Sequence, residues 1–263
     1  MYTHGHHDSV LRSHRTRTVD NSAAYVADRF RPGVRVLDVG CGPGTITVDM
    51  AERVAPGVVT AIDTAADVIE EATALAAAQG VTNIEFGVAD VYALPYPDDS
   101  FDVVHAHQVL QHLTGPVAAL REMRRVCRPG GVVAARDADY AAMTWFPDNA
   151  DLADWLSTYR AVAHANGAEP DAGRRLLSWA RRAGFTDITP TASIWCYATP
   201  DQRETWGRMW SDRIVKSAVA EQAVSGGHAT KADLERISQA WLDWAADEDG
   251  WFTIPHGEIL CVA

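Results

Sequence analysis

A short, largely apolar run that breaks into a glycine-rich turn is the feature that most constrains the fold of this chain. Residues 36–39 suit a buried strand, glycines follow at 40, 42 and 44, and a helical apolar pattern continues over 44–55. Glycine lets the backbone turn tightly and places no Cβ between the chain and a ligand. The first helical turn offers N–H groups at the positive end of a dipole. This arrangement favours a ligand site at the carboxyl end of a strand in an open α/β sheet.

The glycine spacing narrows the choice of ligand. A dinucleotide site needs Gly-x-Gly-x-x-Gly, and Thr45 stands where its third glycine would fall. The spacing therefore disfavours an NAD-dependent oxidoreductase, which stays an alternative. A purely structural bend is the other alternative to a ligand cradle.

Short apolar runs alternate with helical segments along most of the chain. The expected strands are Arg35–Val39, Val58–Asp63, Ile84–Ala89, Phe101–Ala106, Gly131–Arg136, Ile188–Tyr197 and Phe252–Val262, and the expected helices are 44–55, 65–79, 114–127 and 171–184. Strands that alternate with helices predict right-handed βαβ units and a parallel sheet covered on both faces. We therefore expect an α/β fold with a doubly wound, mostly parallel sheet.

Three segments stand outside this alternation. Residues 1–33 predict a polar N-terminal arm with a helix, and residues 139–170 and 200–248 predict helical, aromatic-rich cap additions. Tryptophans at helical spacing there either roof a site or pack the added helices. No linker composition separates these segments from the rest, so we expect a single domain over 1–263.

Composition excludes several partners. The formal net charge of −12 opposes binding to nucleic acid or to an anionic membrane, and no apolar run is long enough to span a bilayer. Four widely spaced cysteines and the absence of a signal-peptide pattern predict a cytoplasmic protein with reduced thiols and no metal site. The sequence leaves a homo-oligomer open.

Two further strand ends carry a carboxylate. Asp63 ends the second strand, where a bidentate acceptor for ribose hydroxyls is expected about twenty residues after the turn. Capping of the next helix is the alternative role for Asp63. Asp90 ends the third strand and can accept from an adenine amino group beside Val91, or simply form a turn.

From about Val34 to Arg136, the chain resembles the class I S-adenosylmethionine-dependent methyltransferases, in particular their small-molecule group. The motifs that carry the resemblance are Leu37-Asp38-Val39-Gly40-Cys41-Gly42-Pro43-Gly44, Asp63, Ala89-Asp90, Phe101-Asp102-Val103-Val104, Val109-Leu110-Gln111-His112-Leu113 and Arg124-Arg125-Val126-Cys127-Arg128-Pro129-Gly130-Gly131. The resemblance implies a Rossmann-like sheet of seven strands whose last strand runs antiparallel. It also implies S-adenosyl-L-methionine as cofactor and S-adenosyl-L-homocysteine as product.

The resemblance further implies a set of cofactor-binding residues. Glycines 40, 42 and 44 would approach the methionine part, Asp63 the ribose, and Asp90 with Val91 the adenine, while residues 106–108 would face the methionine end and the substrate. The predicted cofactor-binding residues are Arg17, Gly40, Cys41, Gly42, Gly44, Asp63, Thr64, Asp90, Val91 and His107. Arg17 would pair with the methionyl carboxylate, or would lie on a solvated face.

Methyl transfer needs alignment and exclusion of water more than it needs a base. A general base is required only where the nucleophile carries a proton. The candidates are His107, His112, Asp137, Asp139 and Tyr140, with packing, capping and turn formation as their alternative roles. We expect a neutral or hydrophobic small-molecule acceptor, with a non-catalytic S-adenosylmethionine-binding protein as the remaining alternative.

Overall fold

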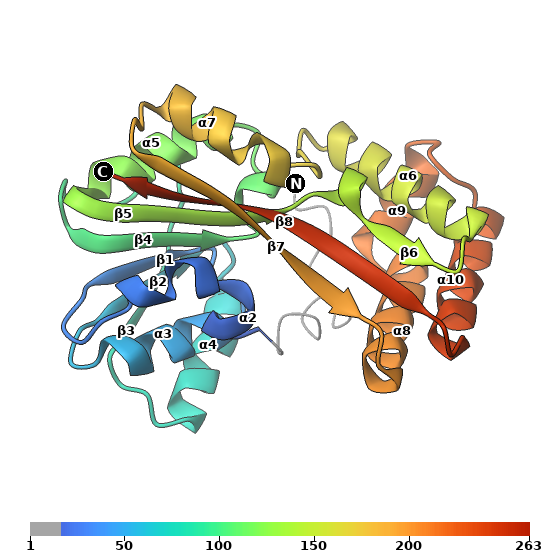
Figure 1. The fold of residues 1–263 in the computed structure, drawn as a ribbon, viewed down its shortest axis with the longest axis horizontal. Helices are drawn as coiled ribbons and strands as arrows, with labels where there is room; N and C mark the ends of the chain where they lie inside the picture. Colours follow the sequence, from blue (N-terminus) through green and yellow to red (C-terminus); the bar gives the residue numbers. More distant parts are fainter. Residues whose placement is uncertain (1–16) are drawn as a thin grey trace. The chain divides into compact units, whose positions relative to one another are not determined.

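The computed structural model describes residues 17–263, and the chain forms two compact units (Figure 1). The sheet unit comprises the described chain up to Asp137 together with Ala172–Ser193 and His256–Ala263. The helical unit comprises Ala138–Asp171 and Ile194–Pro255. The expected additions, 139–170 and 200–248, fall within the helical unit, and the assignment of 1–263 to a single domain stays a prediction.

Among the described residues, the sheet has eight strands in the order β3-β2-β1-β4-β5-β8-β6, and β7 pairs with β8. The strands are β1 (Val36–Val39), β2 (Val59–Asp63), β3 (Ile84–Val88), β4 (Phe101–His107), β5 (Cys127–Ala138), β6 (Thr144–Phe146), β7 (Ile188–Tyr197) and β8 (Trp251–Val262). Strands β1 to β5 pair in parallel, and Figure 1 shows β8 running opposite to β5. The mostly parallel sheet is confirmed. The expected number of seven strands was wrong, because the three residues of β6 are too few to show an alternating pattern.

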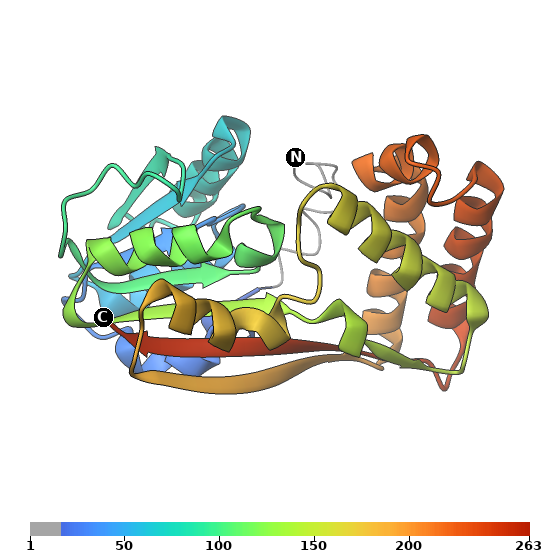
Figure 2. The same ribbon diagram turned by 90° about the horizontal axis from the view of Figure 1, so that it is seen from above.

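Both faces of the sheet unit are covered, as predicted. In β1, Leu37 and Val39 join the core beneath α5 (Pro116–Val126) and α7 (Leu176–Ala183), which lie side by side in Figures 1 and 2. Val36 joins the core formed with α3 (Thr45–Val54). Successive side chains of a strand point to opposite faces, so a short, fully buried strand serves two cores at once. The helix α4 (Ala66–Ala78) packs beside α3.

Two expected helices differ in detail from the structure. The N-terminal helix is replaced by α2 (Val19–Ser22), which begins with a Thr18 capping box, and by the 3-10 helix η1 (Ala24–Arg29). The helix expected over 171–184 begins as the 3-10 helix η4 (Gly173–Arg175) and continues as α7. It ends at Gly184, whose φ of 99° is the left-handed conformation that favours glycine at a helix C-terminus.

The helical unit is built around tryptophan. Its helices are η3 (Tyr140–Ala142), α6 (Ala150–Ala165), α8 (Pro200–Lys216), α9 (Ala218–Ser225) and α10 (Lys231–Ala246). The Trp155 ring meets the rings of Trp210 and Trp241 edge-on at centroid distances of 4.6 and 4.9 Å. All three indoles are buried, so they form the core of this unit. Within residues 17–263, no helix is long and apolar enough to cross a membrane.

Candidate functional site

The glycine turn between β1 and α3 has no room for side chains. Gly40, Gly42 and Gly44 have φ values of 67°, 55° and 82°, a region that other residues rarely adopt. A Cβ at Gly40 would lie 2.5 Å from Cγ2 of Val109, and one at Gly44 would lie 2.9 Å from Cβ of Ala72. Gly40 and Gly44 are therefore needed for packing as well as for the bare backbone that the sequence predicted.

Backbone and side-chain hydrogen bonds tie this turn to β2. The N–H groups of Gly40 and Cys41 donate to the Ile62 carbonyl at 2.8 and 3.0 Å, and the Gly42 N–H donates to Oδ2 of Asp63 at 3.2 Å. Burial raises the pKa of the Cys41 thiol, so this residue contributes as a neutral group. The structure thus brings Gly40, Gly42 and Asp63 together, as the resemblance implied.

A buried network that sequence reasoning missed holds the turn from below. Asp38 on β1 accepts a hydrogen bond from Oγ1 of Thr47 at 2.7 Å, and its other oxygen lies 3.0 Å from Nδ1 of His105 on β4. All three side chains are buried. Asp38 therefore links α3 and β4 to β1, which fixes the strand end from which the turn leaves.

The two predicted adenosine-binding carboxylates also serve the local backbone. Oδ1 of Asp63 accepts from the Ala65 N–H at 3.2 Å, but Ala65 is the N-cap of α4 and no side chain caps this helix. Oδ1 of Asp90 accepts from the Tyr92 N–H at 2.9 Å, which is the turn alternative. Asp90 and Thr64 are exposed, whereas Val91 is buried. A carboxylate oxygen has more than one lone pair, so Asp63 and Asp90 can still accept from a ribose and an adenine. Both contacts stay predictions.

His107 ends β4 in a buried position, with 6 % of its surface exposed. Desolvation, followed by the positive charges of Arg17 and Arg136, lowers the pKa of His107 well below its ordinary value. The imidazole is therefore neutral at pH 7 and is a weaker base than an exposed histidine. Its catalytic role stays a prediction.

His112 lies in the 3-10 helix η2 (Leu110–His112), which Asp137 holds in place. Oδ1 of Asp137 accepts from the Gln111 N–H at 3.0 Å, and the Gln111 amide lies 3.1 Å from Nε2 of His112. Desolvation and then the charge of Arg17 lower the pKa of His112 to about 3. Asp137 is fully buried, and desolvation raises its pKa to about 7.

Arg17 belongs to a side-chain network that reaches from the N-terminal segment to β8. Nη2 of Arg17 donates to Oε1 of Gln108 at 2.7 Å, and Nε2 of Gln108 lies 2.9 Å from Nε2 of His256. The His256 ring stacks on His107 at a centroid distance of 6.3 Å. Gln108 has a φ of 55°, which costs on the order of 1–3 kcal/mol for a residue other than glycine. The sequence placed Arg17, His107 and residues 106–108 at the methionine end, but it indicated no role for His256.

A second network lies next to this one within the sheet unit. Nε of Arg136 is 3.2 Å from Oε1 of Glu258, and both side chains are buried. Glu258 also accepts hydrogen bonds from Thr191 and Ser193. Burial, followed by the charge of Glu258, raises the pKa of Tyr25 well above its ordinary value. Arg136 and Glu258 therefore form a buried ion pair, which adds no net charge to the interior of the sheet unit.

Asp139 and Tyr140 belong to the helical unit. The Asp139 N–H donates to the Pro255 carbonyl at 2.9 Å, and Asp139 precedes η3. The Tyr140 ring stacks on Tyr159 at 4.3 Å, and both predicted catalytic residues are buried. Their roles stay predictions.

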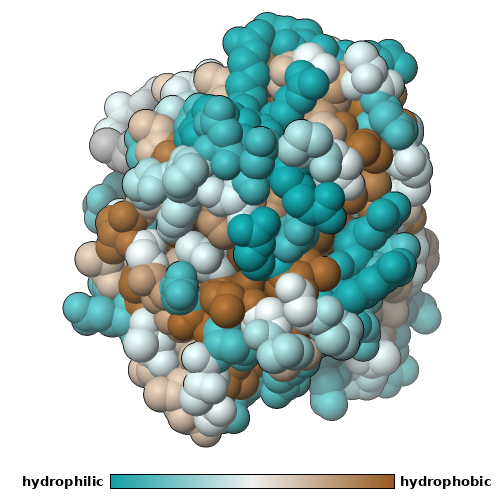
Figure 3. Space-filling model, turned by 90° about the vertical axis from the view of Figure 1, so that its left-hand side faces the viewer, coloured by the Kyte–Doolittle hydropathy of each residue, from teal (hydrophilic) through white to brown (hydrophobic). Residues whose placement is uncertain are grey.

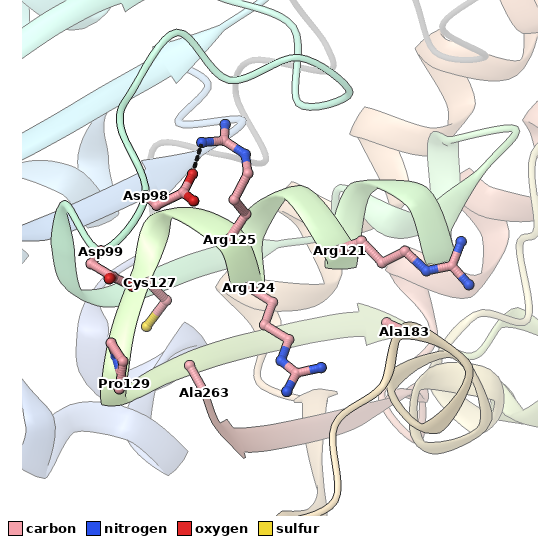
Figure 4. Close-up of a pocket in the computed structure, with 9 residues that line it drawn as sticks. All are labelled: Asp98, Asp99, Arg121, Arg124, Arg125, Cys127, Pro129, Ala183 and Ala263. Atoms are coloured by element: carbon pink, nitrogen blue, oxygen red, sulfur yellow. Dashed lines mark hydrogen bonds and ion pairs between the residues drawn. The ribbon is translucent and has the colours of Figure 1, made fainter.

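A surface cleft of about 400 Å³ lies elsewhere, near the amino-terminal ends of β4 and β5 (Figure 4). Arg121 and Arg124 extend from α5 and donate to the carbonyls of Arg182 and Gly184 at 3.0 and 2.8 Å. They therefore satisfy backbone groups around the C-terminal end of α7. The molecular face in Figure 3 mixes hydrophilic and hydrophobic side chains. The cleft is lined by Asp98, Asp99, Arg121, Arg124, Arg125, Cys127, Pro129, Ala183 and Ala263.

One group in the described part of the chain has the composition of a metal site. The ligating atoms of His164, Glu169 and Asp171 lie within 4.8 Å of one another. Both Asp171 oxygens contact Arg160, however, at 2.6 and 3.1 Å. The charge of Asp171 is therefore already paired with a cation, and the prediction of no metal stays a prediction.

The sheet unit fits the adenosyl cofactor at the glycine turn. The turn is formed by glycines with left-handed backbone and no side chains, and α3 begins after a glycine that supplies no capping side chain. Asp63 stands beside the turn through its bond to Gly42. These features suit a nucleoside with a polar amino-acid tail.

Comparison with known proteins agrees with this cofactor. The family described as Methyltransferase domain matches residues 30–206. An uncharacterized methyltransferase of Schizosaccharomyces pombe is 32% identical over 98% of this chain and 95% of its own length. The 27-O-demethylrifamycin SV methyltransferase of Amycolatopsis mediterranei is 37% identical over 51% of this chain and 50% of its own.

A solved structure shares the fold. Phosphoethanolamine N-methyltransferase 2 of Haemonchus contortus, in complex with phosphomonomethylethanolamine and S-adenosylhomocysteine, superposes with a TM-score of 0.56. It is 17% identical, over 91% of this chain and 51% of its own. Neither the oxidoreductase nor the non-catalytic alternative gains support. The chain belongs to the class I S-adenosylmethionine-dependent methyltransferases.

Proposed function

We propose that this methyltransferase acts on a small-molecule acceptor, a neutral or hydrophobic secondary metabolite. The carrying observation is the burial of His107 at the carboxyl end of β4, where 6 % of its surface is exposed. An acceptor atom that exchanges a proton with His107 has to enter a confined space, which favours a small molecule over a folded macromolecule. The net charge of −12 further opposes a nucleic-acid substrate.

A relative supports the same acceptor class. The name of the Amycolatopsis mediterranei protein denotes a methyltransferase for 27-O-demethylrifamycin SV. The similarity covers half of this chain, so it supports the class of acceptor and not the compound.

The cofactor would be held by the three neighbouring strand ends. Gly40, Cys41, Gly42 and Gly44 would approach its methionine part, Asp63 and Thr64 its ribose, and Asp90 and Val91 its adenine. Bound there, S-adenosylmethionine supplies an electrophilic methyl carbon with a good leaving group. The part of this chain is to orient the acceptor in line and to exclude water.

The state of the histidines supports one kind of acceptor. His107 and His112 are neutral, because desolvation and Arg17 lower both pKa values. A neutral imidazole accepts a proton, yet a lowered pKa makes it a weak base. The site therefore favours an acceptor whose proton leaves easily, such as a phenol or an enol.

Methyl-labelled cofactor tests the proposal. The full chain is incubated with the labelled cofactor and, in parallel, with a panel of phenolic and enolic small molecules, with nucleic acid and with protein. We expect label in a small phenol or enol. Label found only in the nucleic-acid or protein fraction would contradict the proposed acceptor class.

A further inference from the structure

The amide of Gln108 has only one orientation that fits both of its neighbours. A guanidinium carries donors and no acceptor, so the Gln108 atom 2.7 Å from Nη2 of Arg17 has to be Oε1. The NH₂ group of the amide then faces Nε2 of His256 at 2.9 Å and donates to it. The orientation of the amide therefore follows from the chemistry of Arg17.

This orientation fixes the tautomer of His256. Nε2 has to present a lone pair to the Gln108 NH₂ group, so the ring is neutral and carries its proton on Nδ1. Protonation of Nε2 would set two donors against each other. Turning the amide to relieve that clash would break its bond to Arg17. The three side chains are therefore coupled.

The backbone of Gln108 indicates that this coupling is built in. Gln108 follows β4 directly with a φ of 55°, and its N–H donates to the Arg136 carbonyl at 2.7 Å. A left-handed conformation at a residue other than glycine persists only where the surroundings enforce it, and such residues gather at functional sites. Here it places the amide between Arg17 and His256.

The held guanidinium lies at the edge of the sheet where ligands of this fold bind. The positive charge of Arg17 acts on both His107 and His112, and His107 ends β4. Ligands of open α/β sheets bind beyond the carboxyl ends of the strands. We infer that His256 and Gln108 are positioning residues that hold the Arg17 guanidinium ready for the carboxylate of the cofactor's methionine part. This inference rests on the proposed role of Arg17.

Nitrogen-15 NMR of the histidine rings tests the coupling without any ligand. We expect the neutral His256 ring of the wild type to carry its proton on Nδ1. In Gln108→Glu, the carboxylate in place of the NH₂ group should draw the proton to Nε2. A wild-type ring protonated on Nε2, or a ring unchanged in Gln108→Glu, would overturn the inference whatever the outcome of methylation assays.

Calorimetric titration with S-adenosylhomocysteine tests what the coupling serves. His256→Leu removes the acceptor and should raise Kd by up to about tenfold, the upper end of the scale for one neutral hydrogen bond. His256→Gln can return an acceptor oxygen near the Nε2 position and should restore most of the affinity. Gln108→Met is a second variant with the same expectation as His256→Leu, and thermal unfolding verifies that each variant is folded.

A double variant separates positioning from general packing. If His256 acts through Arg17, then Arg17→Ala with His256→Leu should bind no more weakly than Arg17→Ala alone. Additive losses, or wild-type affinity in His256→Leu, would overturn the inference. If the Kd pattern holds while no small molecule is methylated, the proposed acceptor class fails and the positioning role stands.

Discussion

The buried carboxyl of Asp137 gives a stability prediction with a definite sign. Its side chain is fully buried, Oδ1 accepts from the Gln111 N–H at 3.0 Å, and Oδ2 has no hydrogen-bond partner among residues 17–263. Desolvation raises its pKa from 3.8 to about 7. Between about pH 4 and pH 7, the folded state therefore keeps a proton that the unfolded state has already lost.

Because of this difference, Asp137 lowers the free energy of unfolding by an amount that depends on pH. Stability falls with rising pH wherever the folded state binds more protons than the unfolded state. A pKa raised by about 3 corresponds to roughly 4 kcal/mol, lost progressively between pH 4 and pH 7 and constant above. The neutral histidines contribute with the opposite sign, because their folded pKa values are lowered. Their contribution cancels when a variant is compared with the wild type.

Asp137→Asn removes the charge and keeps an oxygen for the Gln111 N–H. Urea unfolding, followed by circular dichroism from pH 4.5 to 8.5, should show the variant gaining stability over the wild type as pH rises, by up to roughly 4 kcal/mol at pH 8. Asp137→Ala also removes the acceptor oxygen and should lose a further 1–3 kcal/mol or so at every pH. A difference between Asp137→Asn and wild type that stays constant with pH would refute the reasoning.

Three further predictions concern the turn and the site. Gly44→Ala should destabilise the protein by about 1–3 kcal/mol more than Gly80→Ala in urea unfolding, because both glycines have positive φ but only Gly44 meets a neighbour, Ala72, at 2.9 Å; equal losses would show that packing there is irrelevant. Asp63→Ala should weaken S-adenosylhomocysteine binding by about 1–3 kcal/mol in calorimetry, and unchanged affinity would remove Asp63 from the site. His107→Ala should lower kcat more than it weakens cofactor binding, and wild-type turnover in steady-state assays would reject His107 as the base.

Local sequence signals predicted the sheet and the proximity of the glycine turn to Asp63. Gly40, Gly42 and Gly44 stand within one turn, and Asp63 ends the next apolar run, so strand ends alone predict that they meet. The structure places Asp63 beside Gly42, as expected. The alternative role of Asp63, capping of the next helix, is not what the structure shows: Asp63 accepts from the Ala65 N–H, and α4 has no side-chain cap.

Contacts between distant segments could not be predicted in the same way. Gln108 meets His256 across 148 positions, and His105 meets Asp38 across 67. Such pairs depend on which strands become neighbours and in what register, and a single sequence does not encode either as a local pattern. The left-handed backbone conformation of Gln108 could not be predicted either, because glutamine has no preference for it.

The central place of β8 has a consequence for synthesis on the ribosome. Of the eight strands, β8 is translated last, yet it lies beside β5 and pairs with both β6 and β7. Until it emerges, β5 presents an open edge that includes the apolar run Val132–Ala135. An open apolar strand edge can pair with other nascent chains. The edge of β5 can be covered only after residues 251–262 have been translated. Chaperones that shield strand edges should therefore raise the folded yield.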